Sequence, residues 1–306
     1  MIYTVTLNPA VDYEIQINEL NLGSINHIDE QRFIPGGKGI NVSRGLSFLG
    51  VDSKAVGFLG GFTGHFMNES LLEESFDSKF VTIKDTTRIN LKIHEQHQMS
   101  EITGKAPRVS IFESEELMHI LDHLKDEDML ILSGSQPRGQ TDLFDAILKR
   151  YQQLNLKIIL DVPGHNYHEL LKYRPLLCKP NIDELKDFAH RELSHLDDII
   201  SAGKELVAMG SQSVIISMGE KGALYVDRTH IYSAKPINGT PRRLFGPGDH
   251  MVSGFVFGHL KGLKITDKFK YSVACASLHI YEPSSYTLNK VEELIDQIEI
   301  EELPYD

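Results

Sequence analysis

The sequence predicts an α/β fold in which helices cover both faces of a mostly parallel central sheet, with a small β-sheet attached as a lid. Short apolar strands alternate with helical patterns from residue 129 onward, which is typical of a parallel sheet. Glycine-rich turns stand at several junctions between strands and helices. Segments in which apolar and polar residues strictly alternate interrupt this rhythm in two places. They predict a second sheet assembled from separate insertions.

The first half of the chain supplies the start of the central sheet and most of the lid. Ile2 to Leu7 is predicted to be a buried strand, and Val11 to Ile17 alternates like a half-exposed strand. The remaining elements expected here are a helix opened by the glycine loop 35–41, a strand at 54–59, a helix from the turn 60–64 to about 74, and lid strands at 24–34, 88–95 and 98–112, including a strand at 109–112.

The second half continues the alternation of strands and helices. The expected strands lie at 129–133, 157–162, 176–179 and 214–218, with a hairpin of 223–226 and 231–234. The expected helices lie at 141–153, near 181 and 196, at 249–263, near 266–279 and near 288–299. No composition break, repeat or low-complexity tract divides the chain, so a single domain over 1–306 is predicted, with lid insertions at about 11–35 and 86–113.

Composition excludes several classes of function. The chain has 306 residues, is 41% hydrophobic and 24% charged, and carries a formal net charge of -12. Such a charge repels nucleic acid and anionic membranes, so an anionic ligand needs a local basic site. Cys178 and Cys275 lie in apolar segments and are expected to be reduced thiols of a cytoplasmic protein. Met1 to Leu7 shows no signal-peptide pattern, and the sequence contains no membrane-spanning stretch. The acidic region 296–302 is interpreted as a solvated end.

The stretch Gly246-Pro247-Gly248-Asp249 is the first candidate site. Apolar residues recur at helical spacing after it, so the glycine loop is predicted to open a helix at Asp249. Helix N-terminal amides attract an anion, and a carboxylate at the rim could accept a proton from an attacking hydroxyl. The alternative is that Asp249 only caps the helix.

Other polar patterns also have two interpretations. Arg88, Asn90 and Lys92 share one face of a predicted strand, which is either an anion-binding surface or a solvated strand face. Two histidine pairs have spacings that could hold a metal, but neither comes with a cysteine or an evident third ligand, so zinc is not expected: His94 with His97, and His119 with His123. The second pair is expected on the face of an ordinary helix.

Eight segments, in order and with consistent spacing, give the sequence a family resemblance. They are TLNPAVDY at 6–13, PGGKGINVSR at 35–44, TRINLKI at 87–93, SEITGKAP at 100–107, SGSQP at 133–137, KPNIDEL at 179–185, ISMGEKGALY at 216–225 and GPGD at 246–249. With these segments the chain resembles the ribokinase-like (PfkB) carbohydrate kinases over nearly its whole length, and most closely the sugar-phosphate kinases of the 1-phosphofructokinase and tagatose-6-phosphate kinase type.

The resemblance implies a ribokinase-like α/β/α sandwich with a β lid, and ATP and Mg²⁺ as cofactors. It implies transfer of the γ-phosphoryl group to a ketose phosphate, either fructose 1-phosphate or tagatose 6-phosphate. By position, Asp249 matches the family's general base, Gly246 and Gly248 match the loop that binds the transferring group, and Lys38 is assigned a catalytic role beside them.

The remaining site residues are also carried over by position. The sugar-binding positions are matched by Asp12, Gly37, Lys38, Asn41, Arg88 and Asn90. The nucleotide-binding positions are matched by Lys179, Asn181, Ser217, Gly219 and Gly222, together with Gly246 and Gly248. Asn181 and Glu184 match the pair that organises Mg²⁺ through water, although Asn-x-x-Glu also has the spacing of a helix capping box.

The loop departs from the family pattern Gly-Ala-Gly-Asp-Ser at two positions. Pro247 replaces the alanine and has no N–H to donate, and His250 replaces the serine. We expect a nearby cation, Lys38 first and Arg243 second, to compensate for the missing donor. The departure also supports an alternative function, in which an impaired family member binds a sugar phosphate or a nucleotide as a sensor.

Two other enzyme classes lack their motifs. No G-x-G-x-x-G follows an early strand, as a nicotinamide-dependent oxidoreductase requires, and the G-x-x-x-x-G-K-[ST] loop of P-loop kinases is missing. The family resemblance implies a sugar phosphate as the small-molecule partner. Exposed lid strands could pair between two chains, which makes a homodimer plausible.

Overall fold

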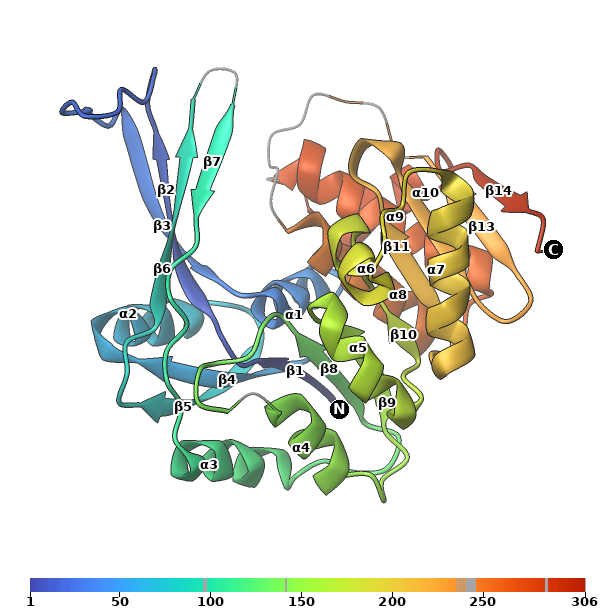
Figure 1. Cartoon of the computed structure of the whole chain (residues 1–306), viewed down its shortest axis with the longest axis horizontal. Coiled ribbons are helices and arrows are strands. Elements are labelled where there is room, and N and C mark those ends of the chain that lie inside the picture. Colours follow the sequence, from blue (N-terminus) through green and yellow to red (C-terminus); the bar gives the residue numbers. More distant parts are fainter. Residues whose placement is uncertain are drawn as a thin grey trace.

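Two β-sheets organise the chain. The computed structural model describes residues 1–95, 98–140, 142–235, 237, 239, 246–283 and 286–305. Within these ranges a ten-stranded sheet forms the centre of the molecule, and a separate four-stranded sheet stands beside it at the upper left of Figure 1. The predicted α/β class with a second, smaller sheet is confirmed.

The large sheet is parallel over most of its width. Its strands are β1 (Ile2–Thr6), β4 (Lys54–Gly60), β5 (Asp77–Ile83), β8 (Met129–Ser133), β9 (Lys157–Asp161), β10 (Leu177–Cys178), β11 (Val214–Ser217), β12 (Ala223–Val226), β13 (Ile231–Ala234) and β14 (Ile300–Leu303). They are arranged in the order β14-β13-β12-β11-β10-β9-β8-β1-β4-β5. Strands β5 to β11 of this order pair in parallel, whereas β12, β13 and β14 continue it as antiparallel strands.

Helices cover both faces of the large sheet (Figure 1). One face packs against α3 (Ile111–Leu121), α4 (Leu143–Arg150), α5 (Gly164–Leu170), α6 (Ile182–Ala189) and α7 (Leu196–Met209). The other packs against α1 (Lys38–Phe48), α8 (Pro247–Leu260), α9 (Ile265–Tyr281) and α10 (Leu288–Ile295). The remaining helices are α2 (Gly61–Leu71), which packs beside β4, and the 3₁₀ turns η1 (Leu171–Tyr173) and η2 (Gly219–Lys221).

The central strands are apolar in continuous runs because both of their faces are covered. In β8, for example, Leu130 and Leu132 face one helical layer and Ile131 faces the other. The two cysteines follow the same division, because Cys178 lies in the first apolar cluster and Cys275 in the second. Both thiols are buried and unpaired, as the sequence predicts.

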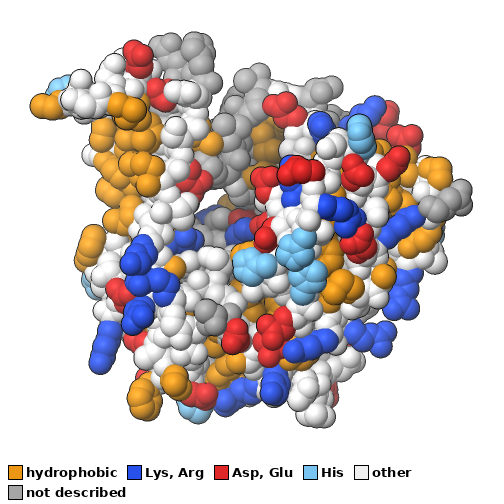
Figure 2. All heavy atoms as spheres, in the orientation of Figure 1, with side chains coloured by type: hydrophobic (Ala, Val, Ile, Leu, Met, Phe, Trp, Pro, Cys, Tyr) orange, Lys and Arg blue, Asp and Glu red, His pale blue; other side chains and the backbone are white. Residues whose placement is uncertain are grey.

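The small sheet consists of β2 (Ala10–Gln16), β3 (Glu30–Gly36), β6 (Arg88–His94) and β7 (Met99–Ile102), in the order β3-β2-β6-β7. Asp12 is in register with Asn90, so the polar residues of β2 and β6 share a face. The other face carries exposed apolar side chains such as Phe33 and Ile89, and Figure 2 shows hydrophobic side chains gathered over the outer side of this sheet.

The segment 109–112 is not a strand. Helix α3 begins at Ile111, and Ser110 caps it through a hydrogen bond from the backbone N–H of Glu113. The Glu113 side chain accepts in return from the backbone N–H of Ser110, which completes a capping box. Of the predicted lid segment 98–112, only β7 is a strand.

Two edge strands of the large sheet differ from expectation. Strand β5, which follows α2, was not predicted, and the acidic end is not merely solvated, because β14 pairs with β13 there. Ile300 and Leu303 are half-buried, whereas Glu301 and Glu302 are exposed, so the strand keeps its charges in solvent. No helix within the described ranges combines the length and the apolarity needed to cross a membrane.

Candidate active site

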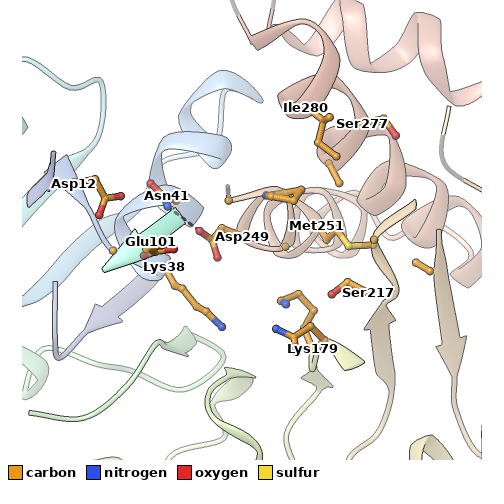
Figure 3. A pocket seen from close by; sticks show the side chains of 18 of the residues that line it. Asp12, Lys38, Asn41, Glu101, Lys179, Ser217, Asp249, Met251, Ser277 and Ile280 are labelled. Carbon is orange, nitrogen blue, oxygen red and sulfur yellow. Dashed lines mark hydrogen bonds between the residues drawn. The ribbon is translucent and has the colours of Figure 1, made fainter. Parts of the chain in front are cut away.

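A cavity of about 500 Å³ lies between the small sheet and the carboxyl ends of strands in the large sheet (Figure 3). Every residue with a predicted catalytic, sugar-binding or nucleotide-binding role lines it: Asp12, Gly37, Lys38, Asn41, Arg88, Asn90, Lys179, Asn181, Ser217, Gly219, Gly222, Gly246, Gly248 and Asp249. Glu184 contacts the ammonium group of Lys38. Residues that are far apart in the sequence therefore meet at one place.

Asp249 lies in the first turn of α8. The helix begins at Pro247, two residues before the predicted start, and its N-cap is Gly246, whose φ of 85° is a left-handed conformation that suits glycine. Among the described residues the Asp249 side chain makes no capping bond, and its Oδ2 accepts a hydrogen bond of 2.8 Å from Nδ2 of Asn41 on α1. The capping interpretation of Asp249 is therefore wrong.

The surroundings of Asp249 adjust its acidity. The residue is only 5% exposed, and burial, followed by the charge of Asp161, raises the pKa of its carboxyl from 3.8 to about 7. The charge of Lys38 and the hydrogen bond from Asn41 act in the opposite direction. A carboxylate with a pKa near neutrality is suited to accept a proton from a bound hydroxyl.

Asp161, at the end of β9, is the centre of a buried charged cluster. Its Oδ1 lies 2.8 Å from Lys38 Nζ and 3.3 Å from Lys179 Nζ. Its Oδ2 has no hydrogen-bond partner among the described residues. Burial opposes ionisation, but the charges of Lys179 and Lys38 hold the pKa of the Asp161 carboxyl below its ordinary value. Two ammonium groups thus stabilise a carboxylate that solvent does not reach.

Asn181 and Glu184 form a capping box at the start of α6. The Glu184 N–H donates to Asn181 Oδ1 at 2.8 Å, and the Asn181 N–H donates to Glu184 Oε2 at 2.9 Å. The second carboxylate oxygen, Oε1, lies 2.8 Å from Lys38 Nζ. The capping interpretation is confirmed, and it leaves Glu184 Oε1 directed at the cluster; the role of this pair in binding Mg²⁺ stays a prediction.

The small sheet contributes a polar wall to the cavity. Asp12 Oδ2 lies 2.7 Å from Lys92 Nζ, and Asp12 Oδ1 accepts a hydrogen bond of 3.0 Å from Asn90 Nδ2. Arg88 donates from Nη2 to the backbone oxygen of Asn8 at 3.1 Å. Since Asn90 and Lys92 are buried, this face is not a solvated strand face.

The opposite wall of the cavity is mainly apolar and comes from α8 and α9. It consists of Met251, Val273, Ala276 and Ile280, with the hydroxyl of Ser277 beside them (Figure 3). Between the two walls, Ser217 forms a β-bridge with Asn181. Gly222 closes this side with a φ of 89°, and a Cβ there would lie 2.0 Å from the backbone oxygen of Ala234. A side chain at position 222 would therefore deform the cavity.

The family model for pfkB family carbohydrate kinases matches residues 5–291. The chain belongs to this family. The 1-phosphofructokinase of Borreliella burgdorferi is 35% identical to it over 99% of both chains. The D-tagatose-1-phosphate kinase of Bacillus licheniformis is 34% identical over 99% of this chain and 100% of the relative.

A solved structure supports the same assignment. The crystal structure of phosphofructokinase-2 from Escherichia coli in complex with substrates and products superimposes with a TM-score of 0.90, at 26% identity, over 97% of this chain and 98% of that chain. The predicted ribokinase-like α/β/α sandwich with its small second sheet is thereby confirmed, and the chain is a kinase of the pfkB family.

The family's loop alanine is replaced here by Pro247, which occupies the first position of α8. At this position an N–H has no intrahelical partner, so proline does not disturb the helix itself. The ammonium group beside the loop belongs to Lys179, because a Cβ on Gly248 would lie 2.8 Å from its Nζ. Lys38 binds Asp161 and Glu184, and Arg243 lies outside the described residues, so their compensating roles stay predictions.

The family's loop serine is replaced by His250, which is buried behind the loop. Its ring stacks on that of His279 with centroids 3.9 Å apart. A Cβ on Gly45 of α1 would lie 2.9 Å from His250 Nδ1, so the glycine makes room for the larger ring. His250 thus fills the contact between α1, α8 and α9.

Two charged residues of the site, Asp161 and Glu101, were not predicted, and Lys92 was predicted only as part of a candidate anion-binding strand face. Asp161 had a signal in the sequence, because an aspartate at the end of an apolar strand lies at the carboxyl edge of a parallel sheet, where ligands bind. Lys92 and Glu101 line the cavity from β6 and β7, and the register that pairs them becomes evident only in the folded small sheet.

The histidine pairs add nothing to this site. His94 lies on β6, but His97 falls outside the described residues. His119 is on α3, as expected, and His123 lies just beyond its end. Across the part of the chain that the structure describes, no group of three or more His, Cys, Asp or Glu side chains is arranged to hold a metal ion.

Proposed function

We propose that this pfkB family kinase transfers the γ-phosphoryl group of ATP to a hydroxyl of a ketose phosphate. The conversions that we propose are fructose 1-phosphate to fructose 1,6-bisphosphate, or tagatose 6-phosphate to tagatose 1,6-bisphosphate. The relatives named 1-phosphofructokinase and D-tagatose-1-phosphate kinase support a ketose phosphate as acceptor. They also make tagatose 1-phosphate a substrate to test.

The observation that carries this proposal is the placement of Asp249. It is a buried carboxyl with a pKa of about 7, in the first helical turn behind a glycine loop, on the wall of a cavity that is also lined by Lys38, Lys92 and Lys179. Asp249 accepts the proton of the attacking hydroxyl as the phosphoryl group leaves ATP. In a loose transition state, positioning and charge stabilisation matter more than a strong base.

The N-terminus of α8, Lys179 and Lys38 stabilise the negative charge of the transferring phosphoryl group. The backbone N–H groups of the first turn and the helix dipole attract an anion, and the lack of a side chain at Gly246 and Gly248 allows its oxygens to come close. Lys179 adjoins Gly248, and Lys38 lines the same cavity. These groups act together in place of the donor that Pro247 lacks.

The sugar phosphate binds on the small-sheet side. Asp12, held by Asn90 and Lys92, accepts hydrogen bonds from sugar hydroxyls, and Gly37 and Asn41 complete the sugar site from the glycine loop and α1. Arg88 binds the phosphate that is already on the sugar, since a guanidinium can grip a phosphate with two hydrogen bonds. The small sheet acts as a lid over this substrate.

The nucleotide binds on the opposite side, with the adenine ring against the apolar wall of α8 and α9. The phosphates of ATP pass Lys179, Asn181, Ser217, Gly219 and Gly222 toward the loop.

Mg²⁺ fits the oxygen ligands beside the nucleotide site. Glu184 Oε1, the Asn181 side chain through water, and the carboxylate of Asp161 supply hard oxygens, and Asp161 Oδ2 has no other partner among the described residues. When bound, Mg²⁺ neutralises charge on the nucleotide phosphates.

A second candidate function is favoured by Pro247 alone. Loss of one N–H from an anion-binding loop typically lowers turnover by about 10²–10³. A protein that bound sugar phosphate or nucleotide without turnover would act as a sensor.

One assay separates the two candidates. Purified protein is incubated with Mg-ATP and, in turn, fructose 1-phosphate, tagatose 6-phosphate and tagatose 1-phosphate, and ADP release is compared by kcat/KM. We expect sugar-dependent ADP release, which the Asp249→Asn variant loses. Binding of either ligand without any sugar-dependent release by the unmodified protein would support the sensor instead.

The exposed apolar face of the small sheet supports a homodimer. Phe33 is 51% exposed and stacks on Tyr13 with ring centroids 4.5 Å apart, and Ile89 and Ile102 are exposed on the same sheet. We propose that two copies of the chain cover this face mutually, which removes apolar surface and sheet edges from solvent.

A further inference from the structure

We infer that Lys38 is an internal counter-ion that competes with a divalent cation for the carboxylates of Asp161 and Glu184. The inference rests on the proposed use of Mg²⁺, and it concerns what the lysine does before and after the cation binds. It gives Lys38 a role distinct from sugar binding, to which its position in the glycine loop first assigned it.

The first argument is geometric. Lys38 Nζ lies 2.8 Å from Asp161 Oδ1 and 2.8 Å from Glu184 Oε1, so a single ammonium group bridges two carboxylates. An ammonium and a Mg²⁺ ion seek the same oxygen lone pairs, and Mg²⁺ requires them at about 2.0–2.1 Å. Both cations cannot occupy the space between these two oxygens.

The second argument is electrostatic. Asp161 is 0% exposed, and a buried carboxylate requires a compensating positive charge. Lys179 supplies part of it from 3.3 Å, and Lys38 supplies the nearer part. A divalent cation brings two charges to the same oxygens, so it can take over the compensation that Lys38 provides.

The third argument concerns access. The Lys38 side chain is 33% exposed and lines the cavity, whereas the Asp161 side chain that it contacts is 0% exposed and does not line it. A cation arriving from the cavity therefore reaches Asp161 only when the lysine moves aside. Glu184 does not need to move, because its Oε2 is fixed by the backbone N–H of Asn181.

Binding of the divalent cation is therefore coupled to the release of the Lys38 ammonium group from the two carboxylates. Once the carboxylates bind the divalent cation, the ammonium group is released into the cavity that Asp249 also lines. There it can meet the negative charge of a phosphoryl group. Cation binding thus converts Lys38 from a structural counter-ion into a ligand for the substrate.

The test measures Mn²⁺ binding without nucleotide or sugar, by electron paramagnetic resonance of the free ion. We expect Lys38→Met to bind Mn²⁺ at least about tenfold more tightly than the unmodified protein, because the competing charge is gone. The matched control is Lys92→Met, which removes a buried lysine paired with Asp12 instead. Its Mn²⁺ affinity should stay within about twofold of the parent.

Two results would overturn the inference. One is a Lys38→Met affinity for Mn²⁺ equal to or weaker than that of the parent, and the other is an equal increase in Lys92→Met. If circular dichroism shows that Lys38→Met does not fold, Lys38→Gln takes its place under the same criteria. Adding Glu184→Gln to the lysine variant should remove most of the gain, which assigns the binding to this carboxylate pair.

The outcome is distinguishable from failure of the proposed function. If the unmodified protein shows no sugar-dependent ADP release and Lys38→Met still tightens Mn²⁺ binding, the kinase proposal fails and the counter-ion inference stands. If the unmodified protein is an active kinase and Lys38→Met leaves the Mn²⁺ affinity unchanged, only the counter-ion inference fails.

Discussion

Asn41 donates a hydrogen bond of 2.8 Å from its side-chain amide to Oδ2 of Asp249, which joins the first turn of α1 to the first turn of α8. The orientation of this amide is determined by its other end, because Asn41 Oδ1 accepts from Arg44 Nη1 at 2.8 Å. Arg44 is in turn paired with Glu74 at 2.6 Å. A chain of polar contacts that starts outside the cavity thus positions the proposed base.

The Asn41→Leu variant should shift the pH dependence of activity. In the unmodified protein kcat/KM should fall as the pH drops below about 7, where Asp249 becomes protonated. A hydrogen bond to the ionised carboxylate lowers its pKa, so the loss of the donor raises this pKa and moves the acidic limb to higher pH. A pH profile of kcat/KM from 5 to 9 would show the shift. An acidic limb at the same or lower pH would contradict the role of Asn41.

The Asp249→Asn variant should be more stable than the parent at pH 8 but not at pH 4. The folded protein holds the Asp249 pKa at about 7 against an ordinary 3.8, so it binds the proton more tightly than the unfolded chain. The stabilisation from the neutral carboxyl is complete below about pH 4 and is lost as the pH rises through 7, at about 1.4 kcal/mol per unit of pKa shift.

Urea unfolding of both proteins at pH 4, 6 and 8 measures this difference, and asparagine keeps the shape of the side chain while removing its charge. If the variant is less stable than the parent at pH 8, ionisation of the buried Asp249 does not destabilise the folded protein, and the prediction is wrong. The same variant should lose at least about 10² in kcat, the contribution typical of a general base.

The Gly248→Ala variant should lower kcat by about tenfold or more. A Cβ at this position would lie 2.8 Å from Lys179 Nζ, so the ammonium group must move away from the loop. Thermal unfolding should change little, because the flexible lysine side chain can yield. Lys179→Met provides the control in a double-mutant cycle: Gly248→Ala should cost much less in that background, and an undiminished cost would exclude displacement of Lys179 as the cause.

The Lys92→Met variant should raise KM for the sugar phosphate by about tenfold and leave KM for ATP unchanged. Lys92 neutralises Asp12 within a buried wall, and without it the carboxylate would repel an anionic sugar. Lys79→Met, which removes an exposed lysine of β5, controls for the change in net charge. An equal rise in both KM values would mean that the substitution perturbs the whole cavity.

The Phe33→Glu variant should convert a dimer into a monomer. The substitution places a charge on the exposed apolar face of the small sheet, at its edge strand β3, where a second copy would have to bury it. Light scattering after size-exclusion chromatography gives the mass of each species. Phe112→Glu alters an apolar side chain on α3 that is 85% exposed, and it should leave the mass unchanged. A monomeric parent would contradict the proposed dimer directly.

The parts of the fold that the sequence predicts are those with strong local patterns. Apolar runs such as 129–133 are strands because a parallel sheet covered on both faces requires them, and the alternation of 11–17 and 88–94 places their polar residues on one face. Pattern alone made the loop 246–249 and the strand face of Arg88 and Asn90 candidate sites, whereas the other site residues were found by family resemblance. Asp12 on β2, Lys38 on α1 and Asp249 on α8 line one cavity only because the small sheet lies beside the large one in the folded chain.

The elements that were mispredicted lie where the sequence carries two conflicting patterns. Residues 109–112 contain enough apolar character for a strand, but the Ser110 and Glu113 pair has the spacing of a capping box, and it favours the helix instead. Strand β14 was not predicted because its acidic residues indicate a solvated end. In the structure they remain in solvent at the edge of the sheet. The charges around Asp161 could not be foreseen, because three lysine–carboxylate contacts depend on tertiary distances.

Pro247 affects the conformational freedom of the loop as well as the number of its N–H donors. The pyrrolidine ring holds φ near -65°, which is already the value of a first helical turn, so the unfolded chain has fewer conformations to lose when this turn forms. Replacing the proline by alanine would restore an N–H and at the same time loosen the residue that follows Gly246. The loop therefore has one N–H fewer and greater rigidity, and we expect its remaining N–H groups to be held in place before any substrate arrives.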